Sequence, residues 1–310
     1  MFAIKHKKIF LMIAVALTVI ALAATFGFGL KPGIDFTGGS VLEVSFPEEK
    51  PTQIEIETAI REFNLGNFLV RSSGENGYLI KMATIDDATK KSIETAISKD
   101  NQIKYVEEKF ITVGPTLGDE LTTDSFIAIV MILIAITLYV AYVFRGVSKP
   151  LSSWKYGFAT IISLAHDVIL TIGFFAILGR FAGVEIDTLF VTAMLVVLGY
   201  SVNDSIVVLD RVREKLSNTK EEFRGPQFKE LVGKSLKETY VRSLNTTITT
   251  ILALVALYIF GGEATRNFSL ALIVGIAAGA YSSIFVAPQL LVVFFERGKK
   301  KLKNSKIGVE

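Results

Sequence analysis

Six long runs of apolar residues decide what this chain can fold into. As a helix, each run of about 20 residues crosses the roughly 30 Å hydrocarbon core of a bilayer. The mean hydropathy of +0.49 agrees, because it is too high for an ordinary soluble domain. The last run contains Pro288, so we expect it to tilt or kink. The runs are residues 9–30, 124–144, 154–178, 188–209, 243–260 and 268–295.

Lysine and arginine gather in four segments that flank these runs. The segments precede the first run, separate the second from the third and the fourth from the fifth, and follow the sixth. With six spans they all fall on one side, while the two short turns on the other side carry only Arg180 and Arg266. The positive-inside rule then predicts that both termini are cytoplasmic in a multi-pass protein of the cytoplasmic (inner) membrane. We expect the basic tail, residues 296–310, to be a topology anchor, with a contact to the ribosome or to lipid as the alternative.

The first run has an alternative interpretation as a cleaved signal peptide. It has a basic start, an apolar stretch and an Ala-Leu-Ala site at residues 21–23. Apolar residues nevertheless continue to Leu30, longer than a usual signal-peptide core. We therefore expect residues 1–30 to be a cytoplasmic start and a retained transmembrane helix.

Residues 31–123 have the character of a soluble domain on the outer side. Strands are predicted at residues 41–46, 67–73, 78–83 and 102–113, and helices at 51–63 and 86–99. The order βαββαβ is the ferredoxin-like pattern. The fold class is thus a membrane α-helical protein: a six-transmembrane-helix bundle with an extracytoplasmic ferredoxin-like α+β domain between helices 1 and 2. Transmembrane helices 2–6 occupy residues 124–295, ahead of the basic tail.

Composition narrows the chemistry. The chain has no cysteine and two histidines, so thiolate chemistry is excluded and we expect no metal site. A net charge of +3 gives no electrostatic reason to expect nucleic acid. No nucleophile–base constellation is evident, so we expect neither an enzyme nor a cofactor.

A glycine-rich segment, residues 33–39, follows the first run. It includes Gly33, Asp35, Gly38 and Gly39. A phosphate-binding loop needs a strand before it and a helix after it, whereas here a membrane helix precedes and a strand follows. We therefore predict a tight turn that joins the outer domain to the helix.

His166 and Asp167 lie near the middle of the third run. A carboxylate in hydrocarbon costs a few kcal/mol even on insertion scales, so it needs a partner or water. Neighbouring positions on a helix do not face each other, so the two residues alone are no catalytic dyad. A functional role and a structural hydrogen bond between helices both remain open.

Asp204 gives the strongest signal of function. It lies in the cytoplasmic half of the fourth run, roughly 9 Å of helix rise from Asp210, which we place at the interface. An ionisable residue at that depth is a functional candidate. Arg242 begins the fifth run at a similar depth, so we predict an ion pair, with snorkelling of Arg242 to the interface as the alternative.

Two further patterns indicate helix packing. Gly275 and Gly279 form a G-x-x-x-G in the sixth run, which is typical of close contact between helices. Four threonines, at positions 246, 247, 249 and 250, give the fifth run a hydroxyl-rich face. That face predicts packing, with a path for water or protons as a less favoured interpretation.

Taken together, residues 33–39, His166-Asp167 and residues 199–214 resemble the SecD/SecF family of bacterial protein-export membrane proteins, and the SecF members in particular. The resemblance covers almost the whole chain and continues at residues 113–115, 242–247, 260–262 and 282–287. It implies that Asp204 and Arg242 form a proton-coupling pair, with His166 and Asp167 as further candidates. It gives a structural role to the motifs that contain Gly33, Asp35, Gly38, Gly39 and Asn203.

The resemblance also implies a function and partners. The expected function is to assist protein export with the proton gradient, together with a SecD-like subunit, the Sec translocon channel and a translocating preprotein; protons and membrane lipid are the other expected partners. The alternative is a proton-coupled small-molecule exporter subunit of the resistance-nodulation-division type. Such a pump needs a large apolar pocket, for which an outer domain of this length looks too small.

Overall fold

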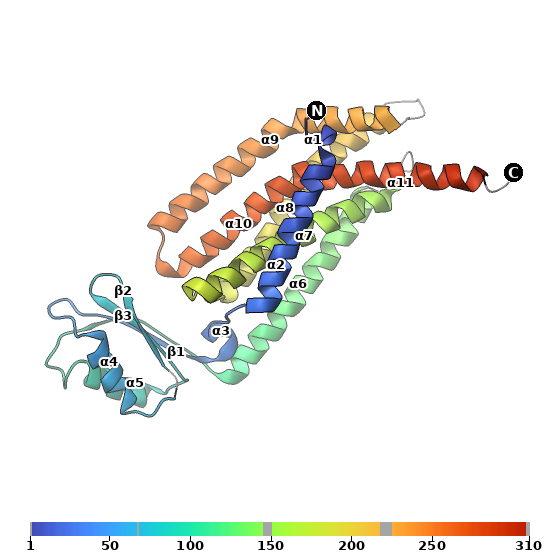
Figure 1. The fold of residues 1–310 in the computed structure, drawn as a ribbon. Helices are drawn as coiled ribbons and strands as arrows, with labels where there is room; N and C mark the ends of the chain where they lie inside the picture. Colours follow the sequence, from blue (N-terminus) through green and yellow to red (C-terminus); the bar gives the residue numbers. More distant parts are fainter. Residues whose placement is uncertain (1, 67, 145–150, 218–224, 308–310) are drawn as a thin grey trace. The chain divides into compact units, whose positions relative to one another are not determined.

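The computed structural model of the protein describes residues 2–66, 68–144, 151–217 and 225–307. The chain divides into two compact units (Figure 1). The helical unit contains Met1–Lys31 and Ile127–Glu310, and the other unit contains Pro32–Phe126. Some of the basic residues used for the topology prediction lie outside the described residues: Arg145, Lys149, Lys220 and Arg224.

Six spans in the described part of the chain are long and apolar enough to cross a membrane, as the sequence predicts. The first is α2, preceded by the short α1, and the sixth is divided between α10 and α11. The helices are α1 (Phe2–Lys5), α2 (Lys7–Phe28), α6 (Pro115–Val143), α7 (Ser153–Ala182), α8 (Thr188–Ser217), α9 (Gly225–Phe260), α10 (Glu263–Phe285) and α11 (Ala287–Ile307).

Several helices extend beyond the apolar runs. Helix α6 begins at Pro115 rather than at residue 124, and α9 begins at Gly225 rather than at residue 243. Hydropathy marks only the part of a helix that lies in lipid, whereas its backbone hydrogen bonds can continue into water. Ion pairs support the extensions of α8 and α9: Arg211 lies 2.6 Å from Glu238, which Lys215 also contacts.

The break expected near Pro288 is present. Helix α10 ends at Phe285, Val286 leaves the helix, and α11 begins at Ala287. Proline has no backbone N–H and its ring crowds the preceding turn, so a continuous helix is unfavourable here. The sixth span is therefore two helices with a break at Val286 between them.

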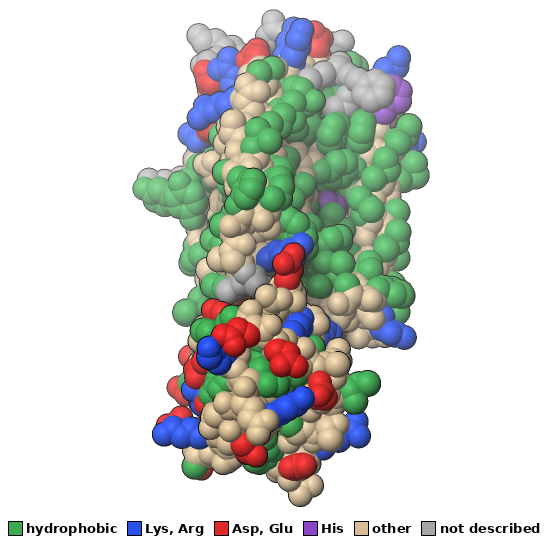
Figure 2. Space-filling model, turned by 90° about the vertical axis from the view of Figure 1, so that its left-hand side faces the viewer, with side chains coloured by type: hydrophobic (Ala, Val, Ile, Leu, Met, Phe, Trp, Pro, Cys, Tyr) green, Lys and Arg blue, Asp and Glu red, His purple; other side chains and the backbone are tan. Residues whose placement is uncertain are grey.

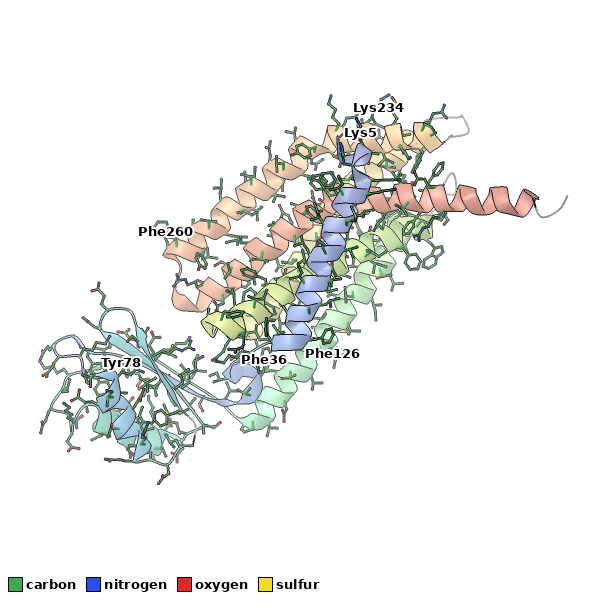
Figure 3. The ribbon with its side chains drawn as sticks, viewed as in Figure 1. Lys5, Phe36, Tyr78, Phe126, Lys234 and Phe260 are labelled. Atoms are coloured by element: carbon green, nitrogen blue, oxygen red, sulfur yellow. The ribbon has the colours of Figure 1, made fainter. Side chains whose placement is uncertain are left out.

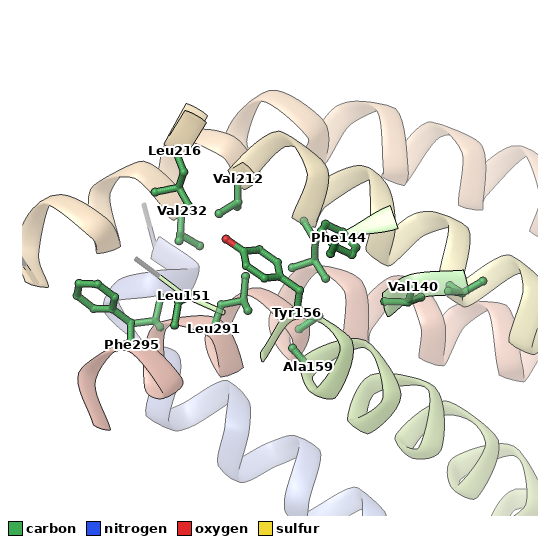
Figure 4. Packing of buried hydrophobic residues seen from close by; sticks show 14 of the residues in the cluster. Val140, Phe144, Leu151, Tyr156, Ala159, Val212, Leu216, Val232, Leu291 and Phe295 are labelled. Carbon is green, nitrogen blue, oxygen red and sulfur yellow. The ribbon is translucent and has the colours of Figure 1, made fainter. Parts of the chain in front are cut away.

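The helical unit is apolar on the outside as well as the inside. Hydrophobic side chains cover much of its visible surface, and charged groups gather toward one end (Figure 2). The described parts of α2, α6 and α9 expose most of their apolar side chains, whereas α7, α8 and α10 supply most of the interior. Near one end, Tyr156 packs among Val212, Val232 and Leu291 from three other helices (Figure 4).

The other unit has the predicted ferredoxin-like order. Its sheet runs β2-β3-β1-β4, and all three strand pairs are antiparallel. Leu42 on β1 lies opposite Ile80 on β3, and both are fully buried, because alternate residues of each strand face the two helices. The elements are β1 (Gly39–Ser45), α4 (Gln53–Arg61), β2 (Leu69–Ser73), β3 (Gly77–Met82), α5 (Asp87–Ile97) and β4 (Val106–Val113).

Local sequence explains where these elements start and stop. Thr52 and Glu55 form a capping box at the start of α4. Strand β4 begins at Val106, later than the predicted residue 102, because the residues before it turn the chain. Lys99, Asp100 and Asn101 all have positive φ, between 51° and 64°. The predicted start of the second strand, Asn67, lies outside the described residues.

The glycine-rich segment forms a turn, as predicted. The single helical turn α3 (Ile34–Thr37) follows Gly33, and Gly38 and Gly39 then adopt φ values of +70° and +133°. Only glycine takes up the second of these without strain. A Cβ atom on Gly39 would also lie 2.9 Å from the carbonyl oxygen of Met82, so the chain passes β3 too closely for a side chain.

Candidate functional site: buried carboxylates between α7, α8 and α10

Asp167 is held by hydroxyl groups from two neighbouring helices. Its side chain is 1% exposed. Its Oδ2 accepts hydrogen bonds from Ser201 on α8 at 2.5 Å and from Ser282 on α10 at 2.7 Å. The hydrogen bond between helices that the sequence left open is therefore present, and it joins three helices at one oxygen atom.

His166 contacts the other oxygen of the same carboxylate. Its Nδ1 lies 2.9 Å from Oδ1 of Asp167, although side chains on neighbouring helix positions usually diverge. Its ring stacks on Tyr281 of α10, with 6.0 Å between the ring centroids. The Nε2 atom is buried and has no hydrogen-bond partner in the described part of the protein. A buried polar nitrogen of this kind is a natural contact for a water molecule.

Asp204 lies on α8 and is 8% exposed. Its Oδ2 accepts a short hydrogen bond from Ser283 of α10. Within the described residues, no lysine or arginine lies within 4.0 Å of this carboxylate. Asp204 is thus held by a neutral group inside the apolar unit, where an unpaired negative charge is costly.

The structure does not form the predicted ion pair between Asp204 and Arg242. The Arg242 side chain is exposed on α9, and no ion pair is found for it among the described residues. Asn203, next to Asp204, is exposed on α8. The sequence placed both partners at a similar depth, but depth does not set the rotation of a helix about its own axis, and that rotation decides which way Arg242 points.

Adjacent serines on α10 link the two carboxylates. Ser282 donates to Asp167 and Ser283 donates to Asp204, just before the break at Val286. Sequence reasoning gave no role to these serines or to Ser201. A signal was available, because hydroxyl groups in an apolar span are the natural partners of intramembrane carboxylates.

The G-x-x-x-G of the sixth span packs as predicted. A Cβ atom on Gly275 would lie 2.3 Å from a methyl carbon of Val197, and one on Gly279 would lie 3.1 Å from Cβ of Ser201. The backbones of α8 and α10 therefore run in close contact beside the site. On α9, Thr246, Thr249 and Thr250 bond mainly to carbonyl oxygens of their own helix.

The fold and the site define a multi-pass membrane protein with two hydroxyl-bound carboxylates inside its helical unit. Family comparison agrees with this class. Residues 92–297 match the family described as "Protein export membrane protein SecD/SecF, C-terminal", and residues 23–46 match the family described as "SecD/SecF GG Motif". The chain belongs to the SecD/SecF family of protein-export membrane proteins, and its function is that of an accessory subunit of the Sec translocase.

Individual relatives are named as subunits of the protein translocase. A "Protein translocase subunit SecF" from Thermobaculum terrenum is 42% identical over 86% of this chain and 84% of its own length. The Haemophilus influenzae protein of that name is 37% identical over 91% and 82%. The crystal structure of a Thermus SecDF, described as a translocon-associated membrane protein, is 30% identical with a TM-score of 0.79. The match covers 94% of this chain but 38% of the SecDF chain.

Proposed function

We propose that this chain works with a SecD-like subunit and uses the proton gradient across the cytoplasmic membrane to assist export of preproteins through the Sec channel. The observation that carries the proposal is Asp204, a buried carboxylate in a membrane span whose described partner is the neutral hydroxyl of Ser283. Ionisation there is expensive and protonation relieves the cost. A proton arriving at this site therefore changes the forces between α8 and α10.

A polar stripe on the outside of the helical unit supports the SecD-like partner. Arg242, Asn245, Thr246 and Thr249 are exposed on one face of α9. Asn203 is exposed on α8, which Tyr200 joins to α9 through a 3.4 Å contact between its hydroxyl group and that of Thr250. The threonine hydroxyls bond within α9, but lipid tails offer no hydrogen bonds to the side chains of Arg242 and Asn245. A second protein with polar groups at the same depth would supply them. SecDF structures contain a chain of more than twice this length, which leaves room for that partner.

Arg242 then has a defined part in the cycle. Its guanidinium stays charged and cannot give up a proton, which leaves a carboxylate as the group that titrates. In the proposed cycle Arg242 faces the partner when Asp204 is neutral, and acts as the counter-charge when Asp204 is ionised. One charge crossing 100 mV supplies about 2.3 kcal/mol, so several protons suffice for a modest movement of helices.

The proposed orientation has both termini in the cytoplasm. Lys5 and Lys234 lie at one end of the helical unit, and Phe260 lies toward the other (Figure 3). Glu296 of α11 pairs at 2.6 Å with both Lys7 of α2 and Lys229 of α9, so these basic segments share one end. The positive-inside rule assigns that end to the cytoplasm, where its lysines meet anionic lipid. The ferredoxin-like unit is then outside, where it holds the emerging preprotein.

Vesicle export with and without an imposed proton gradient tests this function. Asp204→Asn keeps the shape of the side chain but fixes it in a neutral state. We expect normal assembly with a SecD-like chain and loss of the gradient-dependent part of export, and a partial defect for Arg242→Lys. The matched control is Asp210→Asn, because Asp210 is exposed on the same helix and pairs with Arg213 at 3.2 Å. A gradient response in Asp204→Asn equal to that of the control would refute proton coupling through this residue.

The small-molecule exporter receives no comparable support. A cavity of about 490 Å³ lies on the ferredoxin-like unit, but it is lined by charged and polar groups, including Glu43, Glu75, Glu108 and Lys109. A drug-sized apolar substrate is better held by a mainly hydrophobic pocket. The proposal is accordingly one of assisted transport without an enzymatic reaction.

A further inference from the structure

The helical unit contains two helix pairs that are packed backbone to backbone. A Cβ atom on Gly173 of α7 would lie 2.5 Å from both Cα and Cβ of Ala21 on α2. On the other side, Gly275 and Gly279 of α10 bring that helix against Val197 and Ser201 of α8. Contacts this close leave little room for sliding, because interiors are densely packed and side chains cannot yield freely. The α2–α7 pair and the α8–α10 pair are therefore each expected to move as one body.

The Asp167 site lies between these two bodies. The carboxylate comes from α7, and both hydroxyl groups that donate to it, those of Ser201 and Ser282, come from α8 and α10. Each pair thus supplies one side of the contact. The site is a polar joint, one of two polar contacts described between the pairs; in the other, the Tyr281 hydroxyl of α10 donates a 2.9 Å hydrogen bond to the carbonyl oxygen of Phe10 on α2. The strength of the Asp167 site therefore contributes to how firmly the pairs are held together.

The strength of this joint depends on the charge of Asp167. An ionised carboxylate only accepts hydrogen bonds, so Oδ2 can receive both serine protons at once. Charge-assisted bonds of this kind are roughly twice as strong as neutral ones. When the carboxylate takes up a proton that advantage is lost, and Ser282 has another acceptor at hand. Its Oγ lies 3.2 Å from the carbonyl oxygen of Gly279 in its own helix.

The surrounding groups leave this charge open to change. His166 faces the carboxylate from α7 itself, Tyr281 stacks on His166 from α10, and Asp204 on α8 connects to the same turn of α10 through Ser283. Within the described ranges no lysine or arginine pairs with Asp167. Its charge is therefore not fixed by a permanent cation.

We propose that Asp167, Ser201 and Ser282 form a joint whose protonation sets the separation of the α2–α7 pair from the α8–α10 pair. Asp167 is the titrating member and the serines are positioning residues. Helix α2 ends at Phe28, and three residues later the carbonyl oxygen of Lys31 accepts a 2.9 Å hydrogen bond from the backbone N–H of Ile186, which lies between α7 and α8. A shift of the α2–α7 pair therefore moves the residue at which the chain leaves the helical unit. The inference rests on the proposed function for the source of protons, and the two can fail separately.

Distances between spin labels test the joint in the full-length chain in lipid vesicles. The chain has no cysteine, so labels go only where cysteines are introduced. Ile20 on α2 and Val196 on α8 are exposed and report the separation between pairs, while Ile20 with Phe174 on α7 reports a distance within one pair. In the wild type we expect the first distance to shift between acidic and alkaline pH and the second to stay constant.

The variants decide the outcome. Asp167→Asn should show the acidic-pH distance at both pH values, and Ser282→Ala should lose part of the shift, which provides a second test if Asp167→Asn does not insert. Three results would each overturn the joint. The wild type could show no pH-dependent change in the distance between pairs, or an equal change in the distance within one pair. Alternatively, both variants could show the same change in distance as the wild type.

Export assays separate this inference from the proposed function. If Asp204→Asn abolishes the gradient response while Asp167→Asn keeps the distance shift, the joint is wrong and the proposed function stands. If Asp167→Asn loses the shift but wild-type export ignores the gradient, the joint stands and proton-driven export is wrong.

Discussion

Replacement of Gly275 by alanine is the sharpest test of how α10 packs against α8. The new Cβ would lie 2.3 Å and 2.8 Å from the two methyl carbons of Val197. Non-bonded carbons rest at about 3.5–4.0 Å, so the closer contact overlaps by roughly 1.2–1.7 Å. Valine cannot turn aside, because its χ1 angle is nearly fixed in a helix. The helices must separate, and overpacking of this kind costs about 1–3 kcal/mol.

The control for this variant is Gly157→Ala on α7. A Cβ atom on Gly157 meets nothing within 4 Å. Alanine is the better helix former, so this variant should gain roughly 0.5–1 kcal/mol. The double variant Gly275→Ala with Val197→Ala removes both clashing methyl groups and should recover part of the loss. The two sites should therefore couple by about 0.5–3 kcal/mol.

Equilibrium unfolding by SDS in mixed micelles, followed by circular dichroism, measures these differences. The predicted order of stability is Gly157→Ala, wild type, the double variant and then Gly275→Ala. If Gly275→Ala is as stable as Gly157→Ala, α10 does not contact α8 at Val197. Additive effects in the double variant would also contradict the packing, because the loss would then have another origin.

Two predictions concern the ferredoxin-like unit. Residues 32–126 have a hydrophobic core of their own, so expressed alone they should unfold cooperatively and give a mixed α/β circular dichroism spectrum; an all-helical spectrum would refute the fold. Ile93 is fully buried in this core, so Ile93→Ala should lower the free energy of unfolding by about 2–5 kcal/mol. The hydrogen bonds that Asp86 accepts from Thr89 at the start of α5 hold the pKa of Asp86 below its ordinary value. This contribution to stability is present above the unfolded pKa of about 3.9 and is lost as the pH falls through the lower folded value. Asp86→Asn keeps a hydrogen-bond acceptor but does not titrate, so its free energy of unfolding should fall less at acidic pH than that of the wild type. An equal fall at acidic pH would contradict the assignment.

Local patterns along the chain were enough to predict the helices and strands of this protein. Spans in lipid are a matter of local hydropathy, the break near Pro288 follows from a missing N–H group, and the order of the ferredoxin-like unit follows from short-range periodicity. Asp167 and Asp204 were identified in the same way, because a carboxylate in an apolar run is costly wherever the helix packs.

Which side chains meet could not be predicted without the packing of the helices. That Asp167 binds Ser201 and Ser282, that Asp204 binds Ser283, and that Arg242 faces outward all depend on the rotation of each helix about its axis. Close contacts such as Gly275 against Val197 and Gly173 against Ala21 fix that rotation. These contacts join residues far apart in the chain, and each is a small dispersion energy whose sum selects the arrangement. The local patterns of a single sequence do not show which distant residues touch, so they do not give the summed energy of these contacts.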